Sequence, residues 1–208
     1  MSDLNVPDSI PRPFVAAPDA NRYFPSAVAE EARQRLSRSI VRAEGPALLI
    51  GAAGTGKTLL LDVLAQQFAD QMEIIPLLGG QICTRRALLQ SILFELEIPY
   101  EGLDEGEMRL ALLAYLQGAE GKVRRLLLLV DEADALTTRL FAELRMLSNT
   151  SHQGELLINL VMAGGSGLEE IFAEPSLSAL SQRLSTRCYL SPMGRDETFQ
   201  YVRAQSAA

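Results

Sequence analysis

The sequence predicts an α/β fold in which helices cover both faces of a parallel sheet. Three features support this prediction. Short apolar segments of strand length alternate with longer segments of helical period. A glycine-rich loop joins an apolar segment at 47–50 to a helical segment at 57–69. The run at 126–130 is apolar throughout, as expected of a central parallel strand that is buried on both faces.

The other elements follow in order along the chain. Residues 1–25 are irregular and hold five of the ten prolines. Ser26 is placed to cap a helix that runs to about residue 43. Further strands are predicted at 73–78, 156–162 and 187–190. Further helices are predicted at 84–96, 108–116, 137–149, 168–172, 177–184 and from 195 onward, with an acidic loop at 101–107.

Composition restricts the class of protein. The 208 residues are 48% apolar, enough for one buried core and too apolar for a disordered chain. A net charge of −7 argues against general affinity for nucleic acid. Cys83 and Cys188 form no metal-spaced pair, and His152 is the single histidine, in a polar turn, so a histidine-based metal site or triad is excluded. We find no leader and no apolar run of membrane-spanning length, and we predict a cytoplasmic protein.

The glycine-rich loop matches the phosphate-binding pattern G-x-x-x-x-G-K-[ST] at every fixed position. Its glycines allow backbone N–H groups to surround a phosphate, and the helix that follows adds its positive end. The lysine is expected to reach the β- and γ-phosphates of ATP, and the threonine hydroxyl to bind Mg²⁺. The predicted loop residues are Gly51, Ala52, Ala53, Gly54, Thr55, Gly56, Lys57 and Thr58.

A pair of carboxylates ends the apolar run at 126–130. Asp131 at the strand tip is expected to orient Mg²⁺, and Glu132 to act as the general base for water. Lys57 and Asp131 are 131 − 57 = 74 residues apart, which leaves room for a further strand between the two motif strands. This spacing favours the additional-strand branch of P-loop proteins. Residues 131–134 also spell the helicase motif DEAD, but the chain is too short for two helicase lobes.

With these motifs, the chain resembles the AAA+ ATPases of the general secretion pathway protein A (ExeA-type) family. The resemblance also rests on a lead-in segment with Pro13-Phe14, Pro18-Asp19 and 23–26, on the run ELRMLSN at 143–149, and on the C-terminal runs at 177–183, 190–192 and 197–202. It implies an arm at 1–25, an AAA+ nucleotide-binding core at 26–192, and the start of a lid helix at 193–208, with the helical lid almost entirely absent.

The resemblance also implies site roles. Arg183 stands where such ATPases carry an arginine that reaches the phosphates of the neighbouring subunit, and Arg187 is its competitor. Tyr23 and Phe24 either flank the adenine or pack the arm. Two positions depart from the family pattern, in which glutamine is usual: Gly165 stands at the sensor position, and Asp134 follows the Asp-Glu-Ala run.

These observations predict a homo-oligomeric Mg·ATP hydrolase that remodels a protein partner, in the assembly of a secretion machine. Two alternatives stay open. One is a DNA-transposition accessory ATPase (TniB-like), although the acidic charge makes DNA the less favoured partner. The other is a nucleotide-dependent binding switch with little hydrolysis, which the glycine at the sensor position and the missing lid favour.

Overall fold

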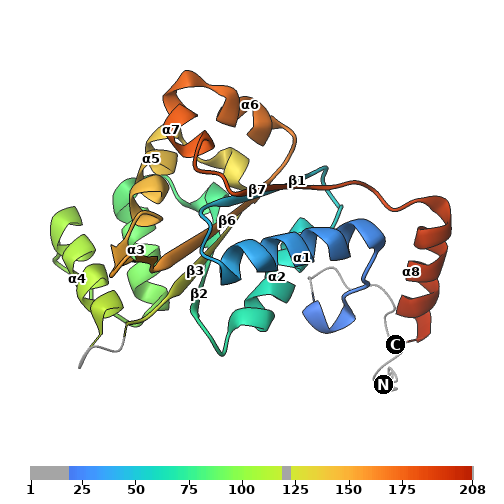
Figure 1. Ribbon diagram of the computed structural model, residues 1–208, viewed down its shortest axis with the longest axis horizontal. Coiled ribbons are helices and arrows are strands. Elements are labelled where there is room, and N and C mark those ends of the chain that lie inside the picture. Colours follow the sequence, from blue (N-terminus) through green and yellow to red (C-terminus); the bar gives the residue numbers. More distant parts are fainter. Residues whose placement is uncertain (1–18, 119–122, 208) are drawn as a thin grey trace, which may run out of the picture.

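A parallel sheet of five strands forms the centre of the computed structural model, which describes residues 19–118 and 123–207 (Figure 1). The strands run in the order β2-β3-β6-β1-β7, and every pair is parallel. Their bounds are β1 Ala47–Gly51, β2 Glu73–Leu78, β3 Leu126–Asp131, β6 Ile158–Gly164 and β7 Thr186–Leu190. Strand β6 lies between β1 and β3, so the predicted additional strand is confirmed. Pro13 and Pro18 of the lead-in lie outside the described residues.

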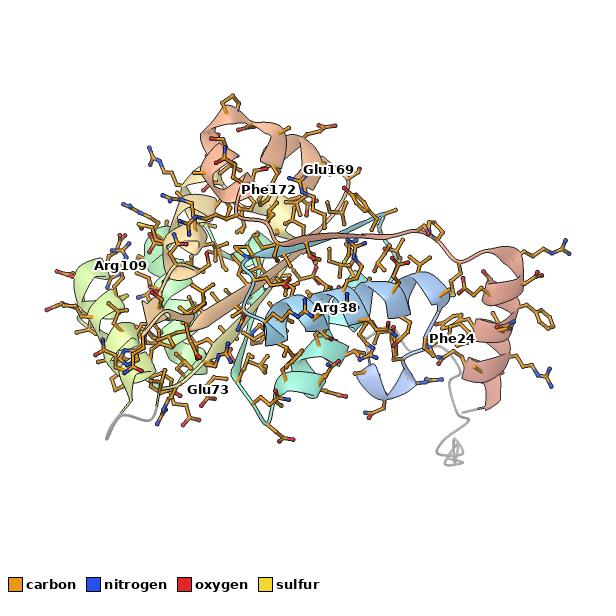
Figure 2. The ribbon with its side chains drawn as sticks, in the orientation of Figure 1. Phe24, Arg38, Glu73, Arg109, Glu169 and Phe172 are labelled. Carbon is orange, nitrogen blue, oxygen red and sulfur yellow. The ribbon has the colours of Figure 1, made fainter. Side chains whose placement is uncertain are left out.

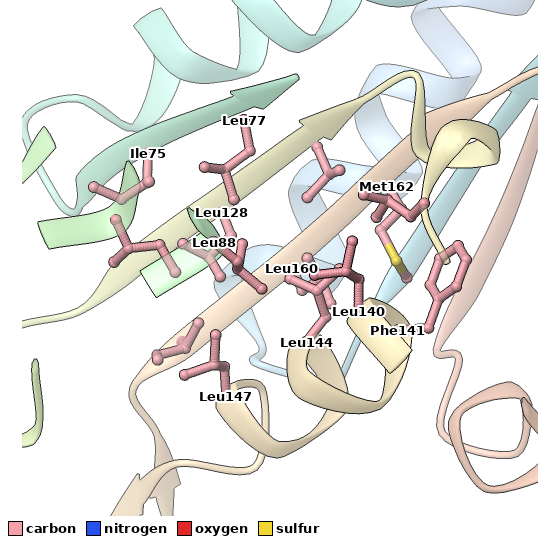
Figure 3. Close-up of a cluster of buried hydrophobic side chains, with 14 of the residues drawn as sticks. Ile75, Leu77, Leu88, Leu128, Leu140, Phe141, Leu144, Leu147, Leu160 and Met162 are labelled. Carbon is pink, nitrogen blue, oxygen red and sulfur yellow. The ribbon is translucent and has the colours of Figure 1, made fainter. Parts of the chain in front are cut away.

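Helices cover both faces of the sheet. Helices α1 (Ala27–Val41) and α2 (Lys57–Phe68) lie on one face, and α3 (Arg85–Glu95), α4 (Glu105–Gln117) and α5 (Thr138–Leu147) lie on the side of the other (Figure 1). Alternate residues of the central strands separate into two buried clusters. Leu128 and Leu160 join the cluster that holds α5 (Figure 3), whereas Leu127 and Val161 join the cluster under α1 and α2. The predicted three-layer α/β arrangement is therefore confirmed.

Local capping explains where the helices begin. The hydroxyls of Ser26 and Thr84 accept hydrogen bonds from the backbone N–H groups three residues on, as predicted for α1 and α3. The prediction for α4 was wrong by three residues, because part of the expected acidic loop belongs to the helix. Asp104 and Glu107 form a reciprocal capping box that starts α4 at Glu105.

A short hairpin precedes β6, and of its residues only Leu156 was predicted as strand, within the segment 156–162. It pairs β4 (Ser151–His152) with β5 (Glu155–Leu156), and Gln153 and Gly154 turn the chain between them with positive φ. The turn itself was expected from the polar residues there. After β6 come α6 (Gly167–Ala173), the 3-10 turn η5 (Pro175–Leu177) and α7 (Ser178–Ser181), which lead into β7.

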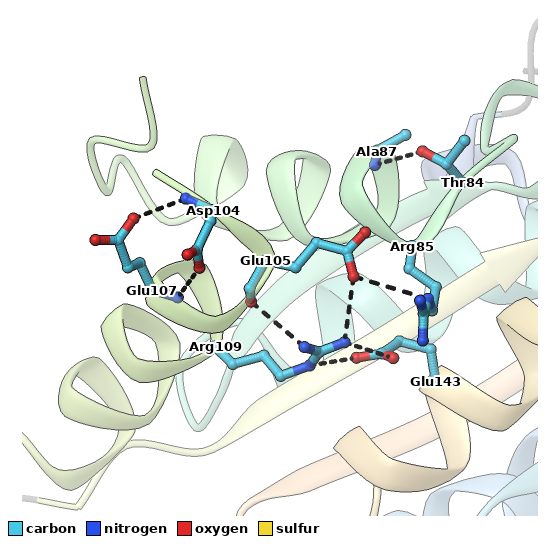
Figure 4. A network of polar contacts seen from close by, with 8 residues as sticks. All are labelled: Thr84, Arg85, Ala87, Asp104, Glu105, Glu107, Arg109 and Glu143. Atoms are coloured by element: carbon cyan, nitrogen blue, oxygen red, sulfur yellow. Dashed lines mark hydrogen bonds and ion pairs between the residues drawn. The ribbon is translucent and has the colours of Figure 1, made fainter. Parts of the chain in front are cut away.

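A buried carboxylate links the helices of the α3–α5 layer (Figure 4). The side chain of Glu143 on α5 is fully buried and accepts two hydrogen bonds from Arg109 on α4, at 2.9 and 2.8 Å. Glu105 lies 3.8 Å from Arg109 and 3.7 Å from Arg85 on α3. The bidentate pair compensates the charge of Glu143 and fixes α4 against α5.

The last described helix, α8 (Arg195–Ala207), stands apart from the sheet and packs on the segment before α1 (Figures 1 and 2). The ring of Tyr201 meets that of Phe24 edge-on, with centroids 5.8 Å apart. The carboxylate of Glu197 accepts a hydrogen bond from the backbone N–H of Ala27 at 2.7 Å, and so caps α1. Within the described ranges, no helix has the length and apolar character to cross a membrane.

Candidate active site

The phosphate loop lies between the carboxyl end of β1 and the first turn of α2. Gly54 and Gly56 have φ of 78° and 90°, in the region that favours glycine. A Cβ atom at Gly51 would stand 2.6 Å from the hydroxyl of Thr55 and 2.8 Å from the carbonyl oxygen of Leu190. The glycine there lets the loop leave β1 against β7, which is a more specific role than the predicted one in wrapping the loop.

Lys57 points back across this loop. Its Nζ donates to the carbonyl oxygens of Gly51 and Ala52, at 2.9 and 3.0 Å. These contacts hold a positive charge over the loop, whose helix also directs its positive end there. The position of Lys57 is therefore suited to a polyphosphate.

Thr58 and Asp131 meet across the gap between α2 and β3. The hydroxyl of Thr58 donates to Oδ2 of Asp131, so two oxygen groups predicted to share a cation do lie together. A pocket of about 390 Å³ opens beside them, and Asp62 lies on its wall one turn after Thr58. Burial raises the pKa of Asp62, and the nearby charge of Asp131 adds to the effect.

Glu132 follows Asp131 in a left-handed conformation, with φ of 50°. Its N–H donates to Oδ1 of Asp131 at 2.9 Å. The loop after β2 lies against it. A Cβ atom at Gly79 would stand 2.3 Å from the carbonyl oxygen of Glu132, and one at Gly80 would stand 2.9 Å from Oε2 of the same residue. The two glycines thus form the surface against which Glu132 packs. Their position after a strand did not indicate this contact.

The two residues that depart from the family pattern lie next to each other. A Cβ atom at Gly165 would stand 3.2 Å from Oδ2 of Asp134, and one at Gly164 would stand 2.8 Å from Oδ1. The carboxyl group of Asp134 therefore occupies space above the end of β6. The two positions are 165 − 134 = 31 residues apart in the sequence, so the sequence alone does not indicate that they are neighbours.

Arg183 lies near the amino ends of the strands, opposite the end that carries the phosphate loop. It precedes β7, whereas the phosphate loop follows β1, and the two strands run parallel with Thr186 beside Ala47 and Leu190 beside Gly51. Its Nη1 donates to Oδ1 of Asn149, the last residue of the run ELRMLSN at 143–149. Arg187 is on β7, and its Nη2 donates to the hydroxyl of Ser181 at 3.0 Å.

Tyr23 and Phe24 occupy different surroundings. Tyr23 packs beside the cluster under α1 and α2, and its buried hydroxyl has no hydrogen-bond partner among the described residues. Burial raises the pKa of Tyr23 to about 12, with Glu30 adding to the effect and Arg33 opposing it. Phe24 contacts Tyr201 of α8 instead. An adenine contact for either residue stays a prediction.

The residues at the loop fit Mg²⁺ chemically. A threonine hydroxyl and a carboxylate are hard oxygen ligands, and Mg²⁺ in phosphate sites typically keeps several waters. Within residues 19–118 and 123–207, no group of three or more His, Cys, Asp or Glu side chains is arranged to hold a metal ion.

Residues 40–172 match the family described as "AAA domain", which is more than half of the chain. The chain belongs to the AAA domain family. Over 197 residues this AAA domain is 34% identical to General secretion pathway protein A of Aeromonas hydrophila, with 92% of this chain and 35% of that protein covered. The chain thus spans about a third of the length of that relative.

Solved structures with the same fold include the following two proteins. Cdc6p from Pyrobaculum aerophilum superposes with a TM-score of 0.72 at 22% identity, covering 91% of this chain and 53% of that one. The Aeropyrum pernix ORC2 protein, solved in ADPNP and ADP complexes, gives a TM-score of 0.72 at 12% identity, with coverage of 89% and 52%. These likenesses confirm the P-loop α/β fold of this AAA domain.

Proposed function

We propose that this AAA domain hydrolyses Mg·ATP between residues 51–58 and the pair Asp131 and Glu132. The observation that carries the proposal is the convergence of Lys57, Thr58 and Asp131 at the carboxyl ends of β1 and β3. Lys57 is directed across the phosphate loop, and Thr58 bonds to Asp131. A ligand is expected at this edge of an open parallel sheet.

The binding step uses fixed positive charge. Backbone N–H groups of the loop and the first turn of α2 bind the phosphates, and Lys57 exchanges its bonds to two carbonyl oxygens for bonds to phosphate oxygens. Thr58 and Asp131 would hold Mg²⁺ together with its waters. When bound, this ion neutralises charge on the phosphate oxygens.

The hydrolytic step uses Glu132. Its carboxylate orients a water for in-line attack on the γ-phosphorus and accepts the proton that the water loses. The bond to the β–γ bridging oxygen breaks, which leaves ADP and phosphate. The contact of Glu132 with Gly80 supports this role, because it limits the positions that the carboxylate can take.

Arg183 completes the site from a neighbouring subunit. Arg183 precedes β7, whose first residue, Thr186, is about 13 Å along the strand from Leu190, the residue beside Gly51, at ~3.3 Å per residue. We therefore assign the guanidinium of Arg183 to the site of another copy and not to its own. A guanidinium there stabilises negative charge as the phosphoryl group is transferred. A homo-oligomer follows from this arrangement.

The output that we propose is mechanical: nucleotide turnover rearranges the subunits of the oligomer and remodels a protein partner. The relative named General secretion pathway protein A supports a role in assembling secretion machinery, in the cytoplasm or at the inner face of a membrane through partners.

The test is the rate of ATP turnover per chain over a wide range of protein concentration. An oligomeric enzyme with an arginine in trans gives a rate per chain that rises with concentration and is abolished by Arg183→Ala. If Arg187→Ala abolishes turnover and Arg183→Ala does not, the assignment moves to Arg187. Tight ATP binding without turnover at any concentration leaves the binding switch as the function.

A further inference from the structure

The backbone that carries Arg183 is held firmly against the start of β1. The N–H of Arg183 donates to the carbonyl oxygen of Leu180 at 3.0 Å, and the N–H of Ser185 donates to that of Pro46 at 2.9 Å. A Cβ atom at Gly45 would stand 2.8 Å from the carbonyl oxygen of Arg183, so the two turns are in close contact. The backbone of Arg183 is therefore fixed in place, although its side chain is exposed.

Asn149 holds the other end of this side chain. It follows Ser148, the C-cap of α5, and its N–H donates to the carbonyl oxygen of Met146 at 3.2 Å. The residue is half-buried, and its Oδ1 accepts from Nη1 of Arg183. The carboxyl end of α5 carries partial negative charge, which also favours a guanidinium there. Two points along the arginine are thus tied to separate elements.

Arg183 differs from the ion-paired arginines in the chemistry of its partner. Among the described residues, ion pairs with glutamate are formed by Arg33, Arg35, Arg42, Arg85 and Arg109. Arg183 instead bonds to a neutral amide oxygen. A carboxylate would neutralise the guanidinium, whereas an amide fixes its direction and leaves its charge available for a phosphate.

We propose that Asn149 is a positioning residue that holds the guanidinium of Arg183 in the orientation that meets the phosphates of a neighbouring subunit. The proposal rests on the trans role given to Arg183 above. It extends that role, because it assigns a function to the asparagine that ends α5. One of the five N–H donors of the guanidinium is used for orientation, and the others remain for the phosphate.

Subunit mixing tests this directly. A Glu132→Gln chain keeps its arginine but lacks the base, and an Arg183→Ala chain keeps the base but lacks the arginine. A mixture of the two regains ATP turnover if the arginine acts in trans. We expect Asn149→Ala to lower the turnover of the mixture about tenfold when placed in the Glu132→Gln chain, since a misdirected arginine loses much of its effect. Placed in the Arg183→Ala chain, it changes nothing.

This asymmetry separates positioning from folding, because a destabilised subunit would lower turnover in either background. Full turnover with Asn149→Ala in the Glu132→Gln chain, or an equal loss in both backgrounds, overturns the role of Asn149 and leaves the trans arginine in place. A rise in turnover overturns it too, since it would mean that Asn149 restrains the arginine. Failure of the parent mixture to regain turnover overturns the trans arginine itself.

Discussion

The Oε2 atom of Glu132 lies so near the backbone of Gly80 that a Cβ atom at position 80 would stand only 2.9 Å from it. The contact joins the loop after β2 to the end of β3, two neighbouring strands of the sheet. The nearest atom is the far end of a flexible side chain, so a methyl group at position 80 would displace the carboxylate and leave the backbone as it is.

Gly80→Ala should therefore lower ATP turnover without lowering stability. A misplaced catalytic group costs roughly 10- to 100-fold in rate, and we expect a loss of this size in kcat with the Kd for ATP unchanged. The matched control is Gly167→Ala, since no atom lies within 4 Å of the Cβ position there. Equal turnover in the two variants would contradict the proposal that Gly80 fixes the position of the Glu132 carboxylate.

Gly79→Ala should act on stability instead. Its Cβ atom would overlap the backbone carbonyl oxygen of Glu132 at 2.3 Å, so the loop itself must move. We expect a loss of about 1–3 kcal/mol in the free energy of unfolding, measured with urea. A variant as stable as wild type would show that the loop has more room than the structure gives it.

The pair of Thr58 and Asp131 predicts a graded effect on Mg²⁺. Thr58→Ala removes an oxygen ligand and should raise the Mg²⁺ concentration for half-maximal turnover about tenfold or more, whereas Thr58→Ser keeps the hydroxyl and stays near wild type. The measurement is turnover against Mg²⁺ at constant ATP. If the serine and alanine variants need the same Mg²⁺ concentration for half-maximal turnover, Thr58 does not bind the ion.

The buried carboxylate of Glu143 predicts a stability difference between two arginines. Arg109→Ala leaves that charge without its bidentate partner and should cost about 3 kcal/mol in the free energy of unfolding. Arg85→Ala breaks only an exposed ion pair of 3.7 Å and should cost less than about 1 kcal/mol. Urea unfolding of both variants measures the difference, and similar costs would argue against the buried pair.

The two cysteines should differ in reactivity. Cys83 is exposed, whereas Cys188 is buried on β7, and burial raises the pKa of its thiol. A raised pKa lowers the thiolate fraction at any pH below it, so both access and ionisation protect Cys188. An aromatic disulfide reagent at pH 8 should modify one thiol per folded chain and two in denaturant. Rapid modification of both thiols in the folded chain would contradict the burial of Cys188 between β7 and α1.

Much of the fold could be predicted because its signals are local. Ser26 and Thr84 mark helix starts, and the apolar run at 126–130 marks a strand buried on both faces. The start of α4 was missed although Asp104 and Glu107 have capping-box spacing, since the acidic stretch was interpreted as a loop. The hairpin of β4 and β5 was missed because two-residue strands carry no periodicity.

The site divides in the same way. Residues 51–58 and the acidic pair could be found from the sequence, because each motif is contiguous and its chemistry is known. Three contacts could not be found from the sequence: that of Gly79 and Gly80 with Glu132, that of Gly165 with Asp134, and the hydrogen bond from Arg183 to Asn149. Each joins segments that are far apart in the chain, and only the order of the strands brings them together.

The most direct test of the proposed hydrolysis compares wild type with Glu132→Gln in two assays on the same preparations, ATP binding and phosphate release. We predict equal ATP affinity and a loss of roughly 100-fold or more in the rate of phosphate release, because only the base has been removed. Phosphate release by Glu132→Gln at the wild-type rate would contradict the account.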